Sequence, residues 1–235
     1  MTFIALILKN IIRQRTRTFL TVLGISLGIT TVVALGVVTE SLKASSSEIL
    51  TLGSADFMVA QEGAADLSFS IVSEDEVPAI AAVDGVASTE GILFHIARVG
   101  SNPFFFLMGR ERESVAAHPP EYRDGGLWAE GAVDQVLLGR RAAKSLGAGV
   151  GDKVMIEDRE FVVVGIYETD GLYEDSGAYA PLSVVQEIAA RAGVVTAAFI
   201  NLEPGADPEQ VGTAIEDTVP GVVSIVDVSD YGKVD

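Results

Sequence analysis

Ser26 lies in a pattern that resembles a hydrolase nucleophile motif, G-x-S-x-G at Gly24–Gly28. In hydrolases this serine occupies a sharp strand–turn–helix connection, where a histidine activates its hydroxyl. Here the serine lies in the middle of an uncharged apolar run, which is typical of a membrane helix. We therefore interpret the match as a coincidence and expect no serine-based catalysis.

Two other stretches have residue types that bind phosphate in other proteins. Gly139–Ser145 resembles a P-loop, but the glycine before Lys144 is missing and the segment reads as a helix rather than a strand–loop–helix. The glycine-rich stretch Gly147–Gly151 has no strand–helix frame suited to a dinucleotide. We expect no nucleotide site in this chain.

Metal and acid–base chemistry also lack a recognisable pattern. His95 and His118 are the only histidines, and neither belongs to an H-E-x-x-H motif. Cysteine is absent, which excludes disulfides, thiol catalysis and Cys-ligated zinc. Carboxylates are so abundant that any one pair indicates little about acid–base catalysis. We expect the chain to be no enzyme and to hold neither a cofactor nor a metal.

Charge is distributed very unevenly along the 235 residues. Four basic residues and no acid precede residue 40, so the net charge of −17 divides into +4 for residues 1–39 and −21 for residues 40–235. Binding to nucleic acid depends on Lys and Arg contacts to phosphates. We therefore exclude nucleic acid as a partner of the acidic part.

The run Thr18–Thr39 contains 22 residues and no charge. A helix of that length spans about 33 Å, enough for a hydrocarbon core of about 30 Å. Basic residues stay on the cytoplasmic side of a membrane, and those before the run are Lys9, Arg13, Arg15 and Arg17. We predict a single-pass protein of the cytoplasmic membrane, with its N-terminus inside, a transmembrane helix at 18–40 and residues 41–235 outside.

The alternative for this run is a cleaved signal peptide. Its apolar region would be shorter, about 7–15 residues, and a small-x-small cleavage site would follow. Ala44–Ser46 matches such a site only loosely. Residues 1–17 combine an apolar stripe with the four basic residues, which predicts an amphipathic helix in the inner interface; the other interpretation is that they extend the membrane helix inward.

The membrane run contains a G-x-x-x-G pattern at Gly24 and Gly28, and Gly36 follows two turns later. Glycines four residues apart share one helix face and allow a second helix to approach closely. We predict that this face packs against protein, with Ser26, Thr30 and Thr31 adding polar contacts nearby.

Capping signals and apolar runs predict an α+β domain after the membrane helix. Helices are expected from the capping box Ser73–Glu76, from Ser183 to a stop at Gly193, from Asp207-Pro208, and over Arg140–Leu146. Lys153–Glu157 and Phe161–Tyr167 are expected to form a hairpin across Asp158-Arg159. The other expected strands are 57–61, 86–99, 104–108, 197–202 and 222–228.

Two helix-to-strand segments in this domain are similar to each other, Ala79–Ser88 and Ala214–Ser224. If they form an internal repeat, each ends the helix of a β-α-β unit, and the two units can pair into one sheet with helices on one face. The units would occupy about 50–100 and 181–235, with an insertion at about 101–180. The alternative is a chance similarity of two helix ends.

Residues 9–40 resemble the first membrane helix of MacB/FtsX-type ABC transporter permeases, with Thr21–Gly28 matching a characteristic T-x-L-G-I-x-I-G-like run. Further matches lie at Val136–Leu146 with Val150–Val154, at Phe161–Ile166 and at Ala180–Leu182, in the order of a MacB-like periplasmic core domain. This resemblance implies that the two units form a porter-like part and that the insertion is a β-rich, sabre-like part.

The resemblance also implies partners and an activity. Such permeases couple ATP hydrolysis by a cytoplasmic ABC ATPase subunit to movements of the outer domain, for export or mechanotransmission. The family has three more membrane helices after that domain, so we expect this chain to work with the missing FtsX-like helices or a second permease copy, in contact with membrane lipid. The alternatives are a signal-anchored extracytoplasmic ligand-binding module and a membrane-tethered hydrolase.

The predicted topology can be tested by cysteine labelling, because the chain has no cysteine of its own. In intact cells, Ser46→Cys should react with an impermeant thiol reagent and Thr2→Cys should not, since the basic residues before the apolar run hold the N-terminus inside. The reverse labelling pattern would contradict the orientation.

Overall fold

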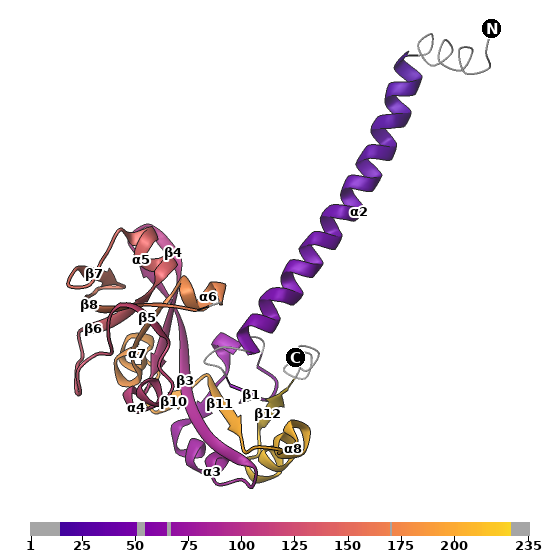
Figure 1. Cartoon of the computed structure of the whole chain (residues 1–235). Coiled ribbons are helices and arrows are strands. Elements are labelled where there is room, and N and C mark those ends of the chain that lie inside the picture. The colour runs from indigo at the N-terminus through magenta and orange to yellow at the C-terminus, as the bar shows by residue number, and fades with distance from the viewer. Residues whose placement is uncertain (1–14, 51–54, 65–66, 170, 227–235) are drawn as a thin grey trace. The chain divides into compact units, whose positions relative to one another are not determined.

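The computed structural model describes residues 15–50, 55–64, 67–169 and 171–226 (Figure 1). The chain divides into two compact units, Met1–Ser45 and Ser46–Asp235. The predicted amphipathic segment 1–17 lies almost entirely outside the described residues. The fold class predicted from the sequence, an N-terminal apolar helix followed by an α+β domain, is confirmed.

Helix α2 runs without a break from Arg15 to Leu50. In a hydrocarbon environment every backbone N–H and C=O must bond within the segment, and an unbroken helix meets that condition. Its 36 residues extend about 54 Å, more than a hydrocarbon core requires. The helix therefore continues through residues 41–50, which the sequence pattern assigns to the start of the outer domain.

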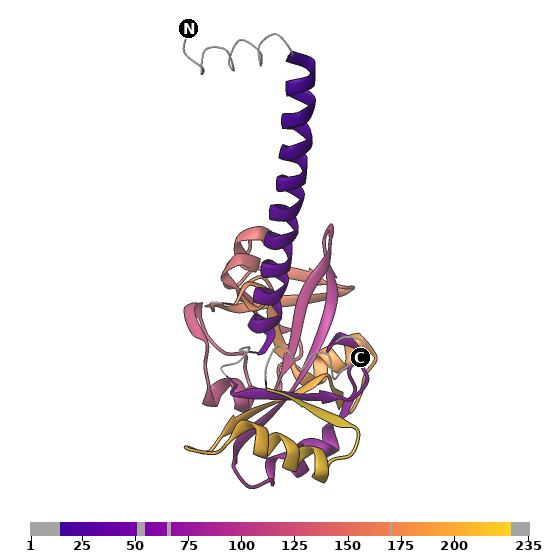
Figure 2. The same cartoon turned by 90° about the vertical axis from the view of Figure 1, so that its right-hand side faces the viewer.

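The β-α-β half of the second unit consists of four strands and two helices. The strands are β1 (Phe57–Gln61), β3 (Val86–Val99), β11 (Ala197–Leu202) and β12 (Val222–Ile225), in the order β12-β1-β11-β3 with antiparallel neighbours. The helices α3 (Val77–Ala81) and α8 (Pro208–Thr218) contact each other and lie on one face of these strands (Figures 1 and 2). Two β-α-β units thus share one sheet, as the repeat predicts.

Local capping explains where the helices of this half begin. The Ser73 N–H donates to Glu76 Oε2 at 3.0 Å, which completes the predicted capping box before α3. Asp207 Oδ1 accepts the N–H groups of Glu209 and Gln210 at 3.0 and 3.4 Å, and Pro208 takes the first helical position of α8. Both predicted starts are therefore confirmed.

The inserted half continues the same sheet through β3. Residues Val86–Ile92 of β3 pair with β11, whereas Leu93–Val99 pair with β4 (Asn102–Arg110). Beyond β4 the order is β9 (Ala178–Pro181), β6 (Gln135–Gly139), β8 (Arg159–Glu168) and β5 (Glu121–Gly125), and β7 (Lys153–Ile156) pairs with β8. The described strands of the two halves form one ten-stranded sheet, and β3 is its common spine (Figure 1).

Short helices and a two-stranded ribbon complete the described part of this unit. The helices are α4 (Arg112–Ala117), α5 (Arg140–Leu146), α6 (Leu172–Asp175) and α7 (Leu182–Ala189), with 3-10 turns at Leu67–Phe69 and Glu74–Glu76. The ribbon pairs β2 (Val72–Ser73) with β10 (Val194–Val195). On one face of the inserted strands an aromatic core gathers Trp128, Tyr167 and Tyr179 around Met108 and Leu137.

The outer edge of β12 is protected by a side chain. Among the described strands β12 pairs only with β1. The Ser224 N–H donates to Glu216 Oε1 at 2.7 Å, and the Ser224 hydroxyl donates to the Gly212 carbonyl at 3.0 Å. Helix α8 therefore supplies the acceptor that a further strand would otherwise provide.

Three sequence-based expectations for the domain are wrong in detail. Helix α7 begins at Leu182, so Ser183 is not its cap, and it ends at Ala190, which takes the left-handed conformation (φ 53°) in place of the expected Gly193. The hairpin turn lies at Glu157-Asp158, because Ile156 pairs with Arg159. Strand β6 directly precedes α5, so Gly139–Ser145 is a strand end followed by a helix rather than helix alone.

The strand-to-helix step at Gly139 leaves no room for a side chain. A Cβ there would lie 2.2 Å from the Asp175 carbonyl oxygen, whereas a Cβ at Gly126 would meet nothing within 4 Å. We predict that Gly139→Ala lowers the free energy of unfolding by about 1–3 kcal/mol, because a methyl group overfills this contact. Urea unfolding of the full chain in detergent, followed by fluorescence of the buried Trp128, measures the loss.

Gly126→Ala is the matched control for this prediction. It should leave the unfolding midpoint close to that of the unaltered chain, because the added methyl group finds open space. Equal midpoints for the two variants would contradict the close approach at Gly139.

Candidate functional site

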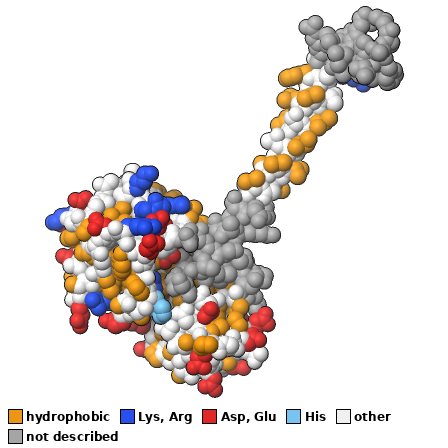
Figure 3. Space-filling view, in the orientation of Figure 1, with side chains coloured by type: hydrophobic (Ala, Val, Ile, Leu, Met, Phe, Trp, Pro, Cys, Tyr) orange, Lys and Arg blue, Asp and Glu red, His pale blue; other side chains and the backbone are white. Residues whose placement is uncertain are grey.

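Most of the described side chains of helix α2 are apolar and exposed. The segment Thr16–Val37 is 22 residues long with a mean hydropathy of 2.2, long and apolar enough to cross a membrane. Its large side chains, including Phe19, Val32 and Leu35, are exposed, and hydrophobic side chains line the visible face of the helix (Figure 3). Such a surface needs lipid or protein around it.

The predicted glycine face lies on this helix. A Cβ added at Gly24, Gly28 or Gly36 meets nothing within 4 Å, so the face is open to a partner. Successive helical residues are rotated by about 100°, so Gly24 and Gly28 lie about 40° apart. By the same rotation of about 100° per residue, Gly36 lies about 80° further around, at the border of the face. Its role in packing stays a prediction.

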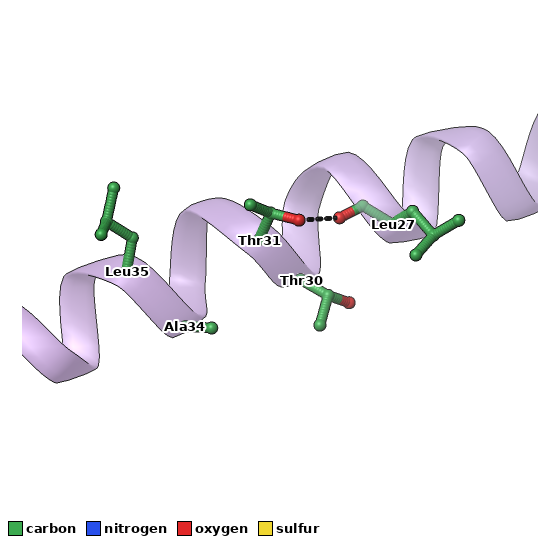
Figure 4. A pocket seen from close by; sticks show the side chains of 5 residues that line it. All are labelled: Leu27, Thr30, Thr31, Ala34 and Leu35. Atoms are coloured by element: carbon green, nitrogen blue, oxygen red, sulfur yellow. Dashed lines mark hydrogen bonds between the residues drawn. The ribbon is translucent and has the colours of Figure 1, made fainter.

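The hydroxyl groups expected to support this face are arranged differently. The Thr31 hydroxyl donates to the Leu27 carbonyl at 2.9 Å within the helix (Figure 4), as Thr21 does to the Arg17 carbonyl at 3.0 Å. Ser26 lies about 160° from Gly24 around the helix. Thr31, seven residues after Gly24, lies only about 20° from it. Polar support for the glycine face stays a prediction, and a shallow hollow on the helix is lined by Leu27, Thr30, Thr31, Ala34 and Leu35 (Figure 4).

The predicted topology determinants lie at the beginning of α2 or before it. Arg17 is exposed in its first turn, and Arg15 is its first residue. Lys9 and Arg13 lie outside the described residues. Their effect on orientation stays a prediction.

The structure does not bring the two histidines into a site. His95 is half-buried on β3 opposite Leu107, where desolvation lowers its pKa below the ordinary value, and His118 is an exposed residue at the end of α4. Over the described ranges, no three His, Cys, Asp or Glu residues gather in a way that could hold a metal ion.

The P-loop-like segment is occupied by the chain itself. The first N–H of α5, from Arg140, donates to Asp175 Oδ1 at 3.1 Å. Asp175 is fully buried, and its Oδ2 lies 3.2 Å from Arg141 Nε and 3.7 Å from an Arg140 guanidinium nitrogen. A carboxylate therefore fills the position that a phosphate takes at other helix N-termini.

A buried ion pair joins β3 to β4. Arg110, the last residue of β4, donates from Nε and Nη2 to the two carboxylate oxygens of Glu90 at 2.7 and 2.6 Å. Their side chains are only 4% and 13% exposed. Burial alone lowers the pKa of Arg110, but the hydrogen-bonded Glu90 carboxylate more than offsets this and raises it. The fork geometry of the pair fixes the orientation of both side chains.

Stacked aromatic rings continue from this pair. The Arg110 guanidinium lies 4.9 Å from the centroid of the Tyr179 ring, which stacks on Tyr167 with centroids 4.3 Å apart. The Tyr167 hydroxyl donates to the Glu174 carbonyl at 2.7 Å, and burial raises its pKa well above the ordinary value. We call Glu90, Arg110, Tyr179, Tyr167 and Asp175 the polar cluster.

The sequence matches the family described as the MacB-like periplasmic core domain over residues 18–218. The chain belongs to this family. No curated protein matches the sequence.

Solved structures of similar fold include three permease or transporter domains. The periplasmic region of MacB from Actinobacillus actinomycetemcomitans has 14% identity and a TM-score of 0.55, covering 76% of this chain and 91% of that structure. The extracellular domain of the noncanonic ABC-type transporter YknZ from Gram-positive bacteria has 12% identity and a TM-score of 0.56, covering 72% and 98%. A domain of a permease protein from Porphyromonas gingivalis has 16% identity and a TM-score of 0.50, covering 76% and 96%.

Two of the motifs that carry the MacB-like resemblance form joints of the inserted half. Val136–Leu146 is the step from β6 to α5, and Ala180–Leu182 is the step from β9 to α7. The other two lie inside regular elements, Phe161–Ile166 within β8 and Thr21–Gly28 within α2.

Sequence reasoning missed the polar cluster of this MacB-like domain. Charged residues make up 21% of the chain, and the pattern around Glu90 does not distinguish it from an exposed residue. One signal was available: Arg110 ends an apolar strand, where a charge is costly unless it is paired.

We predict that Arg110→Met lowers the free energy of unfolding by about 3 kcal/mol or more, because it leaves the Glu90 carboxylate buried without its partner. Urea unfolding of the full chain in detergent, followed by Trp128 fluorescence, is the measurement. Lys153→Met is the control, because it breaks the Lys153–Glu160 pair of similar length (2.7 Å) between side chains that are 63% and 54% exposed. The control should change the free energy of unfolding by about 1 kcal/mol or less. Equal losses for Arg110→Met and Lys153→Met would show that burial does not determine how much the Glu90–Arg110 pair contributes to stability.

Proposed function

We propose that the chain is the N-terminal portion of a MacB/FtsX-type ABC transporter permease. In this proposal it couples ATP hydrolysis by a cytoplasmic partner to movements of the domain outside the membrane, for export or mechanotransmission. The observation that carries the proposal is that one family match, residues 18–218, includes both the membrane-spanning segment and the outer domain. The permease and transporter names of the similar structures support the same class.

The continuity of α2 supports a mechanical role. The helix runs on through Leu50, and β1 begins at Phe57, so only a short segment separates them. An unbroken helix transmits a displacement along its axis better than a flexible linker, whose ends move independently. In this proposal a shift of the cytoplasmic end of α2 is carried along the helix as far as Leu50.

The energy for such movement comes from a partner in this proposal. The segment that most resembles a phosphate-binding loop is closed by Asp175, as described above. We therefore assign ATP hydrolysis to a cytoplasmic ABC ATPase subunit and no catalytic role to this chain. The N-terminal residues with Lys9, Arg13, Arg15 and Arg17 would lie on the same side of the membrane as that subunit.

The glycine face of α2 supports a helical partner in the membrane. Association of membrane helices depends on close van der Waals contact, which small residues allow. The partner would be the remaining FtsX-like helices or a second permease copy, and lipid would cover the rest of the helix.

Bulky substitutions on the glycine face test the proposal. We predict that Gly24→Ile with Gly28→Ile leaves membrane insertion intact, because isoleucine suits lipid, but reduces assembly with the permease–ATPase complex at least several-fold. Co-purification of the ATPase after detergent extraction measures assembly, and resistance to carbonate extraction measures insertion.

Ser26→Ile with Thr30→Ile is the matched control, with the same spacing on a different side of the helix. It should recover as much ATPase as the unaltered chain. If the Gly24→Ile/Gly28→Ile variant recovers as much ATPase as the unaltered chain, α2 is only a membrane anchor. That result would favour the ligand-binding module instead.

A further inference from the structure

The polar cluster begins at the place where β3 changes partners. Glu90 lies in the part of β3 that pairs with β11, opposite Phe199, whereas Arg110 is the last residue of β4. The β3–β4 pairing ends at Leu93 and Gly109, so the two strands diverge just before Glu90 and Arg110. The bidentate ion pair therefore bridges the fork between the β-α-β half and the inserted half.

The cluster then continues to the opposite side of the inserted half through direct contacts. Arg110 lies over Tyr179, Tyr179 stacks on Tyr167, and the Tyr167 hydroxyl holds the Glu174 carbonyl of α6. The next residue, Asp175, accepts the first N–H of α5. Each link is at van der Waals or hydrogen-bond distance, and the side chains concerned are buried.

We propose that the polar cluster is a rigid coupler between the two halves. Through it, the position of the β-α-β half at the β3–β4 fork determines how firmly α6 and the first turn of α5 are held in their folded conformation. The coupler rests on the proposed function in one respect: it becomes useful if the outer domain moves. Its existence, however, is a property of this chain alone and can be tested without an ATPase.

Physical reasons distinguish a coupler from a plain stabilising contact. A buried ion pair is seldom more stable than apolar side chains of the same shape, so stability is a poor explanation for Glu90 and Arg110. A bidentate pair also has one favourable geometry, and losing it leaves two uncompensated charges. A displacement of one strand must therefore either carry the partner side chain with it or break the pair.

Hydrogen exchange of the full chain in detergent, read by mass spectrometry, tests the coupler. Glu90→Gln should raise exchange about tenfold, or about 1.4 kcal/mol of local opening free energy, at the amides of Ser176, Gly177 and Arg140. These amides donate to Leu172, Glu174 and Asp175, which lie on α6. Amides of α8 should keep their rates, because α8 lies outside the cluster.

Tyr167→Phe is a second variant, because it removes only the hydroxyl that holds Glu174. It should raise exchange at the same three amides and leave the β3 and β4 amides unchanged. Glu160→Gln, which breaks an exposed pair on β8, is the control and should change none of them.

Two outcomes would overturn the coupler. One is a Glu90→Gln effect confined to β3 and β4, and the other is a uniform rise across the domain, which indicates global destabilisation. If Glu90→Gln fails to fold, Tyr167→Phe decides alone, and unchanged exchange at Ser176 and Gly177 refutes the proposal.

Discussion

Strand β3 is hydrogen-bonded along both of its edges, to β11 over Val86–Ile92 and to β4 over Leu93–Val99. The rest of the outer domain depends on this arrangement. Side chains alternate between the two faces of a strand, so one register on β3 decides which face of each half is buried. A slip by one residue would turn the core side chains of both halves toward water. The two halves share strand β3 and are not joined by a linker.

The fork in this spine interrupts the β3–β4 hydrogen-bond ladder. The strands diverge beyond Leu93 and Gly109, and the charged side chains of Glu90 and Arg110 fill the space between them. Two charges in such a place are tolerated only because each satisfies the other in a bidentate pair. The stacked tyrosines beside Arg110 add an attractive ring face for the cation without adding a second charge.

Local signals predicted much of the architecture, and long-range contacts account for what was missed. Ser73 with Glu76 starts the 3-10 turn that leads into α3, and Asp207 starts α8, because a cap is settled within four residues. Strands β5, β6 and β9 are short and take their partners from distant parts of the chain, so no local pattern reveals them. The polar cluster was missed for the same reason, since the partner of Glu90 is Arg110 on β4, 20 residues further along the chain. The apolar run of α2 was evident, but its continuation through the polar residues 41–50 was not.

The hydrogen bond from Ser224 to Glu216 matters for copies of the domain that are anchored in the same membrane. A membrane anchor confines copies of the domain to two dimensions, where neighbours meet far more often than they would in free solution. An exposed strand edge would then recruit other edges and build a growing sheet. Because Glu216 accepts the Ser224 N–H of β12, that position offers no donor to a neighbouring chain. One carboxylate of this acidic domain thus also limits edge-to-edge association of crowded copies at this position.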